Sequence, residues 1–118
     1  MGATAILTRA VVGLQAHAVT VECHIAAGLP RTTIVGLAEG AVKESRDRIK
    51  SALRTCGFHF PRGHVIVNLA PSHLTKSGSS YDLPIALAIL CASDQIEISD
   101  AARTEFVGEL GLFGEIRR

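Results

Sequence analysis

Aromatic residues and long apolar runs are scarce in this sequence, and both absences limit what the chain can be. Aromatic residues make up only 4% of the 118 residues and tryptophan is absent, so the core must be built from aliphatic side chains. No apolar run reaches the length of about 18 residues that a membrane-spanning helix needs. The first residues lack a basic segment followed by a long apolar one, so no secretory signal is predicted. We therefore expect a cytoplasmic protein with no membrane partner.

Cysteine pairs and metal-ligand motifs are also missing. The three cysteines, Cys23, Cys56 and Cys91, are odd in number and far apart, which predicts reduced and mostly buried thiols rather than disulfides. The histidines are dispersed, without an H-x-x-x-H or C-x-x-C pair, and no metal site is predicted. They are His17, His24, His59, His64 and His73.

Nucleotide-binding motifs are absent as well. A P-loop requires G-x-x-x-x-G-K-[ST], in which the lysine follows the second glycine. In this chain Lys76 precedes Gly78, and the pattern G-x-G-x-x-G does not occur. We therefore expect the chain itself to bind no nucleotide and no other cofactor.

Hydrophobic periodicity predicts an α/β domain with the element order β-β-β-α-β-α-β-β. Alternating and β-branched stretches predict strands, and spacing of three and four predicts helices. The run 64–70 is apolar on both faces, which predicts an interior strand covered on both sides. Asp82 is predicted to be the N-cap of a helix that is apolar all round. Strands are expected at 3–12, 17–26, 32–37 and 64–70, helices at 39–56 and 83–93, and a strand, a glycine turn and a strand within 104–118. Residues 1–118 then form a single two-layer domain, with two main helices on a mixed sheet.

The loop that precedes the second helix contains candidate chemistry. Ser79 or Ser80 lies just ahead of the helix N-terminus, with Lys76 nearby. A Ser–Lys dyad needs a lysine of lowered pKa within hydrogen-bond reach, and Lys76 is expected on an exposed polar loop. The alternative is that both serines cap the helix, which the sequence favours because capping serines are far commoner than catalytic ones.

Basic residues lie along one edge of the helix predicted at 39–56. Such a stripe can contact a nucleic-acid backbone. The net charge of only +1 argues against binding through bulk charge, and a solvated face balanced by Glu44 and Asp47 is the favoured alternative. The candidate nucleic-acid-binding residues are Lys43, Arg46, Lys50 and Arg54 of this helix, together with Lys76 of the loop.

Five long sequence blocks stand out, namely IVGL, AVKESRDR, VNLAP, YDLPIALA and FVGEL. They resemble the N-terminal domain of the ComM/YifB family, the magnesium chelatase-like competence proteins, and the resemblance covers nearly all of residues 4–118. The chain departs from the family pattern at Ala38 and Gly40. The resemblance implies a longer cytosolic protein in which an AAA+ ATPase motor follows this domain, and the end of the chain at Arg118 within a predicted strand agrees with that expectation. It also implies a hexameric DNA helicase that promotes branch migration in natural transformation, with ATP and Mg²⁺ in the motor and DNA as the partner.

The same region resembles the Lon protease domain and the C-terminal domain of RadA, which implies the fold they share with a domain of a small-subunit ribosomal protein. Lon carries its nucleophile in the pattern P-K-D-G-P-S-A-G. Here 76–78 fall on K-D-G and Ser80 falls on the nucleophile, whereas Tyr81 and Asp82 replace the following Ala-Gly. The position of the Lon lysine lies beyond Arg118. The domain is therefore expected to be non-catalytic, with a peptidase that uses Ser80 and a protein-interaction module as the alternatives.

Overall fold

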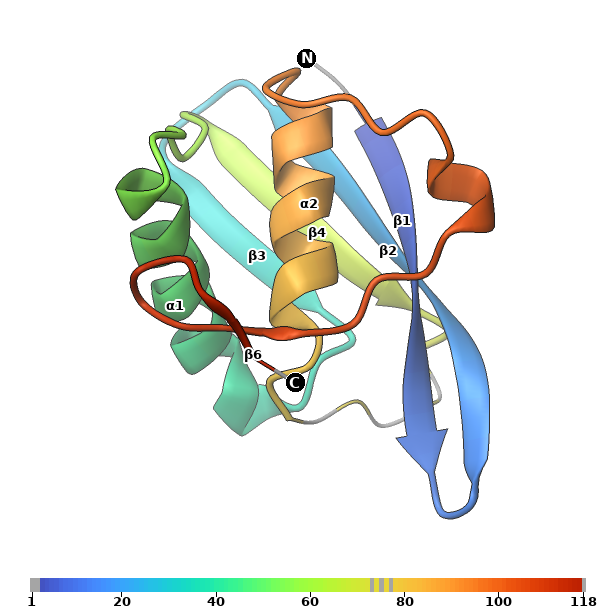
Figure 1. The fold of residues 1–118 in the computed structure, drawn as a ribbon. Coiled ribbons are helices and arrows are strands. Elements are labelled where there is room, and N and C mark those ends of the chain that lie inside the picture. Colours follow the sequence, from blue (N-terminus) through green and yellow to red (C-terminus); the bar gives the residue numbers. More distant parts are fainter. Residues whose placement is uncertain (1–2, 73, 75, 77, 118) are drawn as a thin grey trace.

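The two main helices cover one face of a four-stranded sheet, and a small hairpin lies at the end of the chain (Figure 1). The computed structural model describes residues 3–117 except 73, 75 and 77. The sheet strands are β1 (Ala3–Val12), β2 (Gln15–Ala26), β3 (Arg31–Val35) and β4 (His64–Ala70), and the helices are α1 (Val42–Thr55) and α2 (Asp82–Ala92). The shorter elements are the 3-10 helices η1 (Glu39–Ala41) and η2 (Ala101–Arg103) and the strands β5 (Glu109–Leu110) and β6 (Ile116–Arg117). The predicted class and the predicted order of strands and main helices are confirmed.

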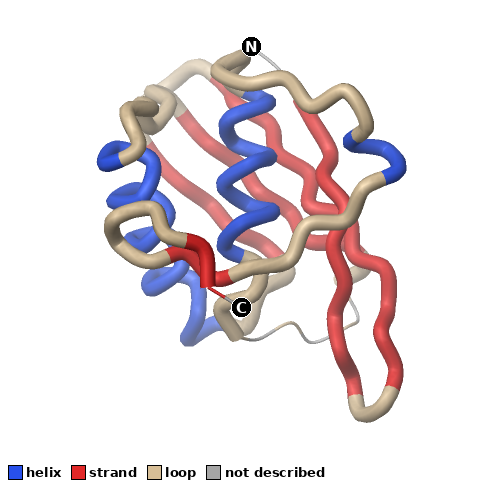
Figure 2. The backbone as a smooth tube through the Cα atoms, in the orientation of Figure 1, coloured by secondary structure: helices blue, strands red, loops and turns tan. Residues whose placement is uncertain are grey.

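The sheet is mixed and has the strand order β1-β2-β4-β3. β1 and β2 form an antiparallel hairpin, with Ile6 opposite Val21, and β2 also pairs antiparallel with β4. β3 and β4 run parallel, so the chain must cross over between them, and α1 supplies this crossover. The β1–β2 hairpin is longer than its neighbours and projects beyond the body of the domain (Figure 2).

The core is aliphatic, as the scarcity of aromatic residues predicts. Alternate residues of β4 face it, with Val65, Val67 and Leu69 fully buried. α2 lies centrally against β1 and β2 and contributes Ile85 and Ile89, because its apolar residues surround the helix axis. None of the helices within the described ranges is long and apolar enough to cross a membrane.

Two burial predictions are wrong. The strand now called β4 is interior, but its alternate residues, including Ile66 and Asn68, are only half-buried. Both main helices lie on the other face of the sheet, so β4 is covered on one side only (Figure 1). Cys56 is exposed because it follows the last turn of α1, whereas Cys23 is buried and Cys91 is half-buried.

The first helix begins later than its periodicity predicts. The positions where the chain departs from the family pattern, Ala38 and Gly40, lie at a separate 3-10 turn, and α1 itself starts at Val42. Its other end agrees with the prediction, because Gly57 follows the helix with a φ of 90°. This arrangement brings the N-terminal turn of α1 beside the loop that leads into α2, through a hydrogen bond of 2.6 Å from Ala38 N–H to the Lys76 carbonyl oxygen.

Candidate functional site

A buried carboxylate, Asp82, joins three elements at the N-terminal end of α2. Arg48 of α1 donates from Nε to Asp82 Oδ2 at 2.6 Å and from Nη2 to Oδ1 at 3.2 Å. Ser45 Oγ donates to Oδ1 at 2.7 Å, and the Leu110 N–H of β5 donates to Oδ2 at 3.3 Å. The prediction that Asp82 is an N-cap is wrong: it is the first residue of α2, and the N-cap position is held by Tyr81 without a side-chain hydrogen bond.

The electrostatics of this network favour the charged pair. The hydrogen bond to Asp82 raises the pKa of Arg48, while partial burial opposes the shift. A carboxylate in the first turn of a helix is also stabilised by the helix dipole. Asp82 is only 1% exposed, so its charge is compensated by Arg48, by hydrogen-bond donors and by the N-terminus of α2. Arg48 and Asp82 therefore fix α1, α2 and β5 relative to one another.

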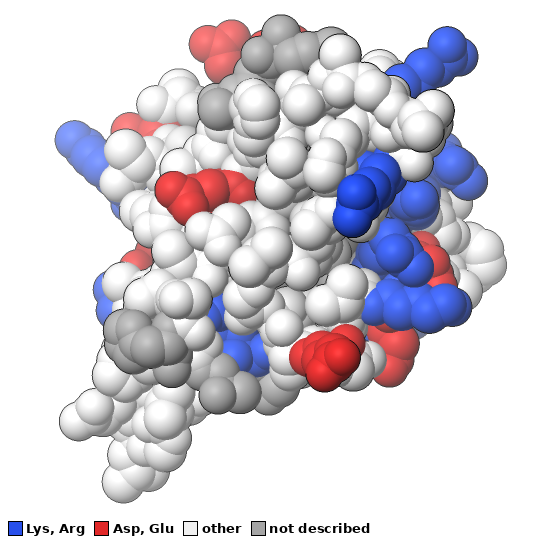
Figure 3. Space-filling model, turned by 180° about the vertical axis from the view of Figure 1, so that it is seen from behind, with Lys and Arg blue, Asp and Glu red and all other residues white. Residues whose placement is uncertain are grey.

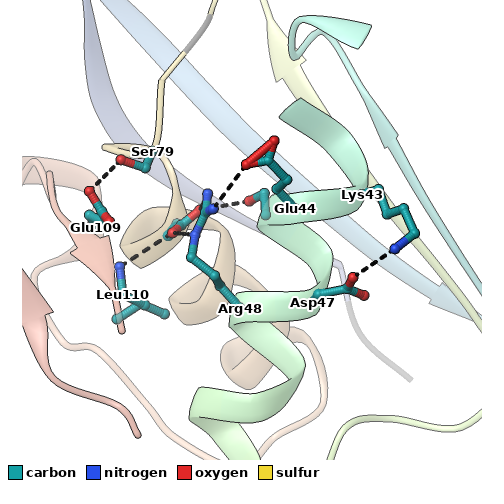
Figure 4. Close-up of polar contacts among 9 residues, drawn as sticks. Lys43, Glu44, Asp47, Arg48, Ser79, Glu109 and Leu110 are labelled. Atoms are coloured by element: carbon teal, nitrogen blue, oxygen red, sulfur yellow. Dashed lines mark hydrogen bonds and ion pairs between the residues drawn. The ribbon is translucent and has the colours of Figure 1, made fainter. Parts of the chain in front are cut away.

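A cleft of about 570 Å³ opens beside this network. It lies between the start of α1, the loop before α2 and β5, and Ser79 Oγ donates to Glu109 Oε1 across it at 2.6 Å. Glu44 reaches into the same region, where its Oε1 lies 3.9 Å from Arg48 Nη1 (Figure 4). The lining residues are Ala38, Gly40, Ala41, Glu44, Arg48, Gly78, Ser79 and Glu109. Because Arg48 is already paired to Asp82, the remaining charged side chains of this cleft, Glu44 and Glu109, are acidic.

The serine and lysine candidates of the loop do not form a dyad. Lys76 is not on an exposed loop: its residue is 1% exposed, and Nζ donates to the carbonyl oxygens of Pro71 at 2.5 Å and Leu74 at 2.6 Å. This burial lowers its pKa. Within the described part of the chain, Ser80 Oγ makes no hydrogen bond to a lysine or histidine side chain.

The capping prediction for the two serines is also wrong, because neither side chain caps α2. Ser79 instead bonds to Glu109, while the Ser80 carbonyl oxygen accepts from Gly108 N–H at 2.9 Å. Two residues named in the sequence patterns, His73 and Ser77, lie outside the described residues. Among the others, no group of three or more histidine, cysteine, aspartate or glutamate side chains is placed to hold a metal ion.

The basic residues of α1 lie on its outer face, away from the cleft. Lys43 pairs with Asp47 at 3.2 Å, and Lys50 Nζ lies 4.9 Å from the centre of the Phe60 ring. Glu44 does not balance this face, because it points toward Arg48 on the cleft side (Figure 4). Lysine and arginine side chains gather along the margin of the domain that α1 forms (Figure 3). Lys43, Arg46, Lys50 and Arg54 therefore share one surface, and the buried Lys76 does not belong to it.

The fold and the cleft define a small α+β domain whose polar network connects its secondary-structure elements. A family model described as subunit ChlI of Mg-chelatase matches residues 21–118. The chain therefore belongs to this Mg-chelatase-like family.

Curated relatives extend the match over nearly the whole chain. The chain is 50% identical to YifB of Salmonella typhimurium over 110 residues, which is 93% of this chain and 22% of that protein. It is 47% identical to the competence protein ComM of Haemophilus influenzae over 117 residues, which is 99% of this chain and 23% of that protein. It is 39% identical to Rv2897c of Mycobacterium tuberculosis over 108 residues, covering 92% of this chain and 22% of that protein. The chain thus spans less than a quarter of the length of these relatives, and its similarity to YifB and ComM fits their N-terminal domain.

Proposed function

We propose that this chain is a non-catalytic N-terminal domain of a Mg-chelatase-like AAA+ ATPase that acts on DNA in the cytoplasm. In this proposal the whole protein is a hexameric helicase that promotes branch migration during natural transformation, and its motor domain binds ATP and Mg²⁺. Family membership and the similarity to a protein named for competence support the proposal. The present domain contributes a surface that guides DNA and packs against neighbouring subunits.

The observation that carries the DNA contact is the outer face of α1. Its four basic residues span positions 43 to 54, which is a length of about 16 Å along a helix. Asp47 is the acidic residue among them, and it lies 3.2 Å from Lys43 and 4.0 Å from Arg46 Nε. The face therefore keeps net positive charge in a protein of nearly neutral composition, and it can neutralise several phosphates.

Charge reversal on this face tests the proposal in the full-length protein. Lys43, Arg46, Lys50 and Arg54 are changed together to Glu, and binding of fluorescent DNA is measured over a range of salt concentrations. For each phosphate that the variant no longer neutralises, the slope of log K against log salt should fall by about 0.9 for duplex DNA or about 0.7 for single strands. Unchanged affinity and slope would remove α1 from the path of the DNA.

Two single substitutions serve as matched controls. Asp47→Asn removes the negative charge from the same face and should tighten DNA binding. Arg103→Ala removes an exposed cation of η2, which lies outside the α1 face and 3.9 Å from Asp100, and it should leave DNA binding unchanged. Opposite effects of Asp47→Asn and of the fourfold change to Glu would show that the sign of the charge on α1 matters rather than its shape.

The peptidase alternative lacks a supporting observation. Ser80 lies at the edge of a cavity of about 480 Å³ that Val107 and Glu109 also line. A serine nucleophile requires a base within hydrogen-bond reach, and the described residues supply none at Ser80. Lys76 directs its ammonium group to two backbone carbonyl groups instead.

A further inference from the structure

The outer edge of β3 is a surface that the DNA contact does not use. β3 pairs with β4 on one side, and no strand within the described ranges pairs with its other side. Arg31 N–H donates to the Gly63 carbonyl oxygen at 3.0 Å, so the backbone groups of Arg31 point toward β4. Because these directions alternate along a strand, the N–H and C=O groups of Thr32 and Ile34 point away from the sheet.

The opposite edge of the sheet is partly covered, unlike the β3 edge. At β1, Phe106 N–H donates to the Leu7 carbonyl oxygen at 2.9 Å, and Glu105 forms a bridge with Leu7. Glu105 also accepts a hydrogen bond of 2.8 Å from Arg9. The segment after η2 thus covers the β1 edge around Leu7. An uncovered edge strand is a template on which another extended chain can pair.

Positive charge surrounds the free edge. α1 runs beside β3, and the basic margin seen in the space-filling view lies on this side of the domain (Figures 1 and 3). The start of β3 adds Arg31, and the adjoining Gly63 follows Arg62, which is exposed. The cations around the edge are Lys43, Arg46, Lys50 and Arg54 on α1, Arg31 at the start of β3, and Arg62 in the loop before β4.

We propose that the free edge of β3 binds an extended acidic peptide, which adds to the sheet as a further strand. Successive side chains of an added strand point to opposite faces of the sheet. Carboxylates on one face then meet the cations of α1, and those on the other face meet Arg31, which lies on the open side of the sheet. A second copy of this chain at the same edge brings two basic α1 faces together, so the charge selects an acidic partner over a dimer.

The peptide site goes beyond the proposed DNA contact but shares its cations. A peptide that occupies the edge covers part of the outer face of α1, so the peptide and DNA compete for Lys50 and its neighbours. The backbone groups of Thr32 and Ile34 contribute to the peptide site alone. This difference allows the two proposals to fail separately.

The first test uses the full-length protein and a fluorescein-labelled peptide, Asp-Val-Asp-Val-Asp-Val, with fluorescence anisotropy as the readout. The acidic peptide should bind, and the same peptide with Lys in place of Asp should bind at least tenfold more weakly. Two further peptides carry backbone N-methyl groups on alternate residues. One is methylated at the Asp residues, and the other at the Val residues. Methylation of the set whose N–H groups face β3 should weaken binding at least tenfold, and methylation of the other set should leave it unchanged.

The second test changes the protein. Thr32→Pro removes an outward N–H at an edge strand, where proline is tolerated, while Thr32→Val removes the hydroxyl and keeps the N–H. Thr32→Pro should weaken binding of the acidic peptide at least tenfold and leave DNA binding unchanged. Thr32→Val should bind both the peptide and DNA with normal affinity. Lys50→Glu should weaken binding of both the peptide and DNA.

Three outcomes would overturn the proposal. The first is no binding of the acidic peptide, or equal binding of the acidic and basic peptides. The second is equal binding of both N-methylated peptides, which needs no protein variant and so does not depend on the folding of Thr32→Pro. The third is a change of oligomeric state in Thr32→Pro without a change in peptide affinity, which would assign the edge to a second copy. Loss of DNA binding in the α1 variants bears on the proposed function and not on this site.

Discussion

The Asp82 network predicts that a change of one atom will loosen the contact between α1, α2 and β5. Asp82→Asn keeps the size of the side chain but replaces one carboxylate oxygen with an amide group. The native carboxylate accepts from Ser45, from two nitrogens of Arg48 and from the Leu110 N–H. In the variant, the amide must face one pair of these donors, which then loses its acceptor.

The magnitude follows from the burial of the pair. Removing one partner of a buried ion pair costs about 3–5 kcal/mol, because the other charge is left without compensation. Asp82 is 1% exposed, whereas the Arg48 side chain keeps 22% exposure and can turn toward water. We therefore expect a loss near the lower end, about 3 kcal/mol. That is a large part of the total of about 5–15 kcal/mol that stabilises a typical domain.

Urea unfolding followed by circular dichroism measures this loss, as a lower midpoint with an unchanged slope. Arg48→Met and the double variant complete a double-mutant cycle that isolates the pair from effects of shape. Glu44→Gln serves as a control, because Glu44 lies 3.9 Å from the same guanidinium and is 73% exposed. A change below about 0.5 kcal/mol for Asp82→Asn, or a coupling energy near zero, would refute the structural role assigned to the network.

Two further stability predictions concern the core. Thr8 is buried and its Oγ1 has no hydrogen-bond partner in the described structure. Thr8→Val should therefore raise the free energy of unfolding by about 1–2 kcal/mol. As a control, Thr4→Val at a half-buried position of the same strand should change it by less than about 0.5 kcal/mol. Burial raises the pKa of Cys23 from 9.0 to about 12. A raised folded-state pKa means that the contribution of Cys23 is fully present below pH 9 and is lost as the pH rises toward 12, because only the unfolded chain ionises in that window. From pH 8 to pH 10 the wild type should therefore lose about 1.4 kcal/mol more stability than Cys23→Ala, and equal losses would contradict the assigned pKa.

The periodicity of the sequence was sufficient to predict the order of the strands and main helices, because it records which face of each element is buried. The helix at α1 illustrates this: Ser45, Ile49, Ala52 and Leu53 fall on one face at helical spacing, and all four are buried. The same reasoning fails for β4, where Ile66 is apolar yet lies on the open face of the sheet. An apolar side chain on a half-covered strand costs little, so its presence does not prove that something covers it.

The polar network was missed because its partners are distant in the chain. Asp82 has the position and residue type of a helix cap, and local rules assign it that role. Its partner Arg48 lies 34 residues earlier, and no local pattern connects them. One signal was present: Ser45 interrupts the apolar face of α1, and a polar side chain on a buried face requires a buried partner.

Lys76 is a residue whose burial the sequence does not predict. Polar, small neighbours in the loop indicate exposure, and the lysine itself is rarely buried in proteins. It is buried here because the loop folds back and presents the carbonyl groups of Pro71 and Leu74 to its ammonium group. Such backbone acceptors exist for every sequence, so residue types alone do not reveal which lysine will use them.

The faces of α1 separate folding from binding. Its apolar face holds Ile49 and Leu53 in the core, its cleft side holds Arg48 against Asp82, and its outer face carries Lys43 and Lys50. The ion pairs of the outer cations lie at the surface, and such pairs contribute less than about 1 kcal/mol to stability. Substitutions there should therefore alter DNA and peptide binding without unfolding the domain. Substitutions at Asp82 should instead destabilise the domain and leave the charge of the outer face unchanged. That separation is what allows a loss of binding in the α1 variants to be attributed to charge.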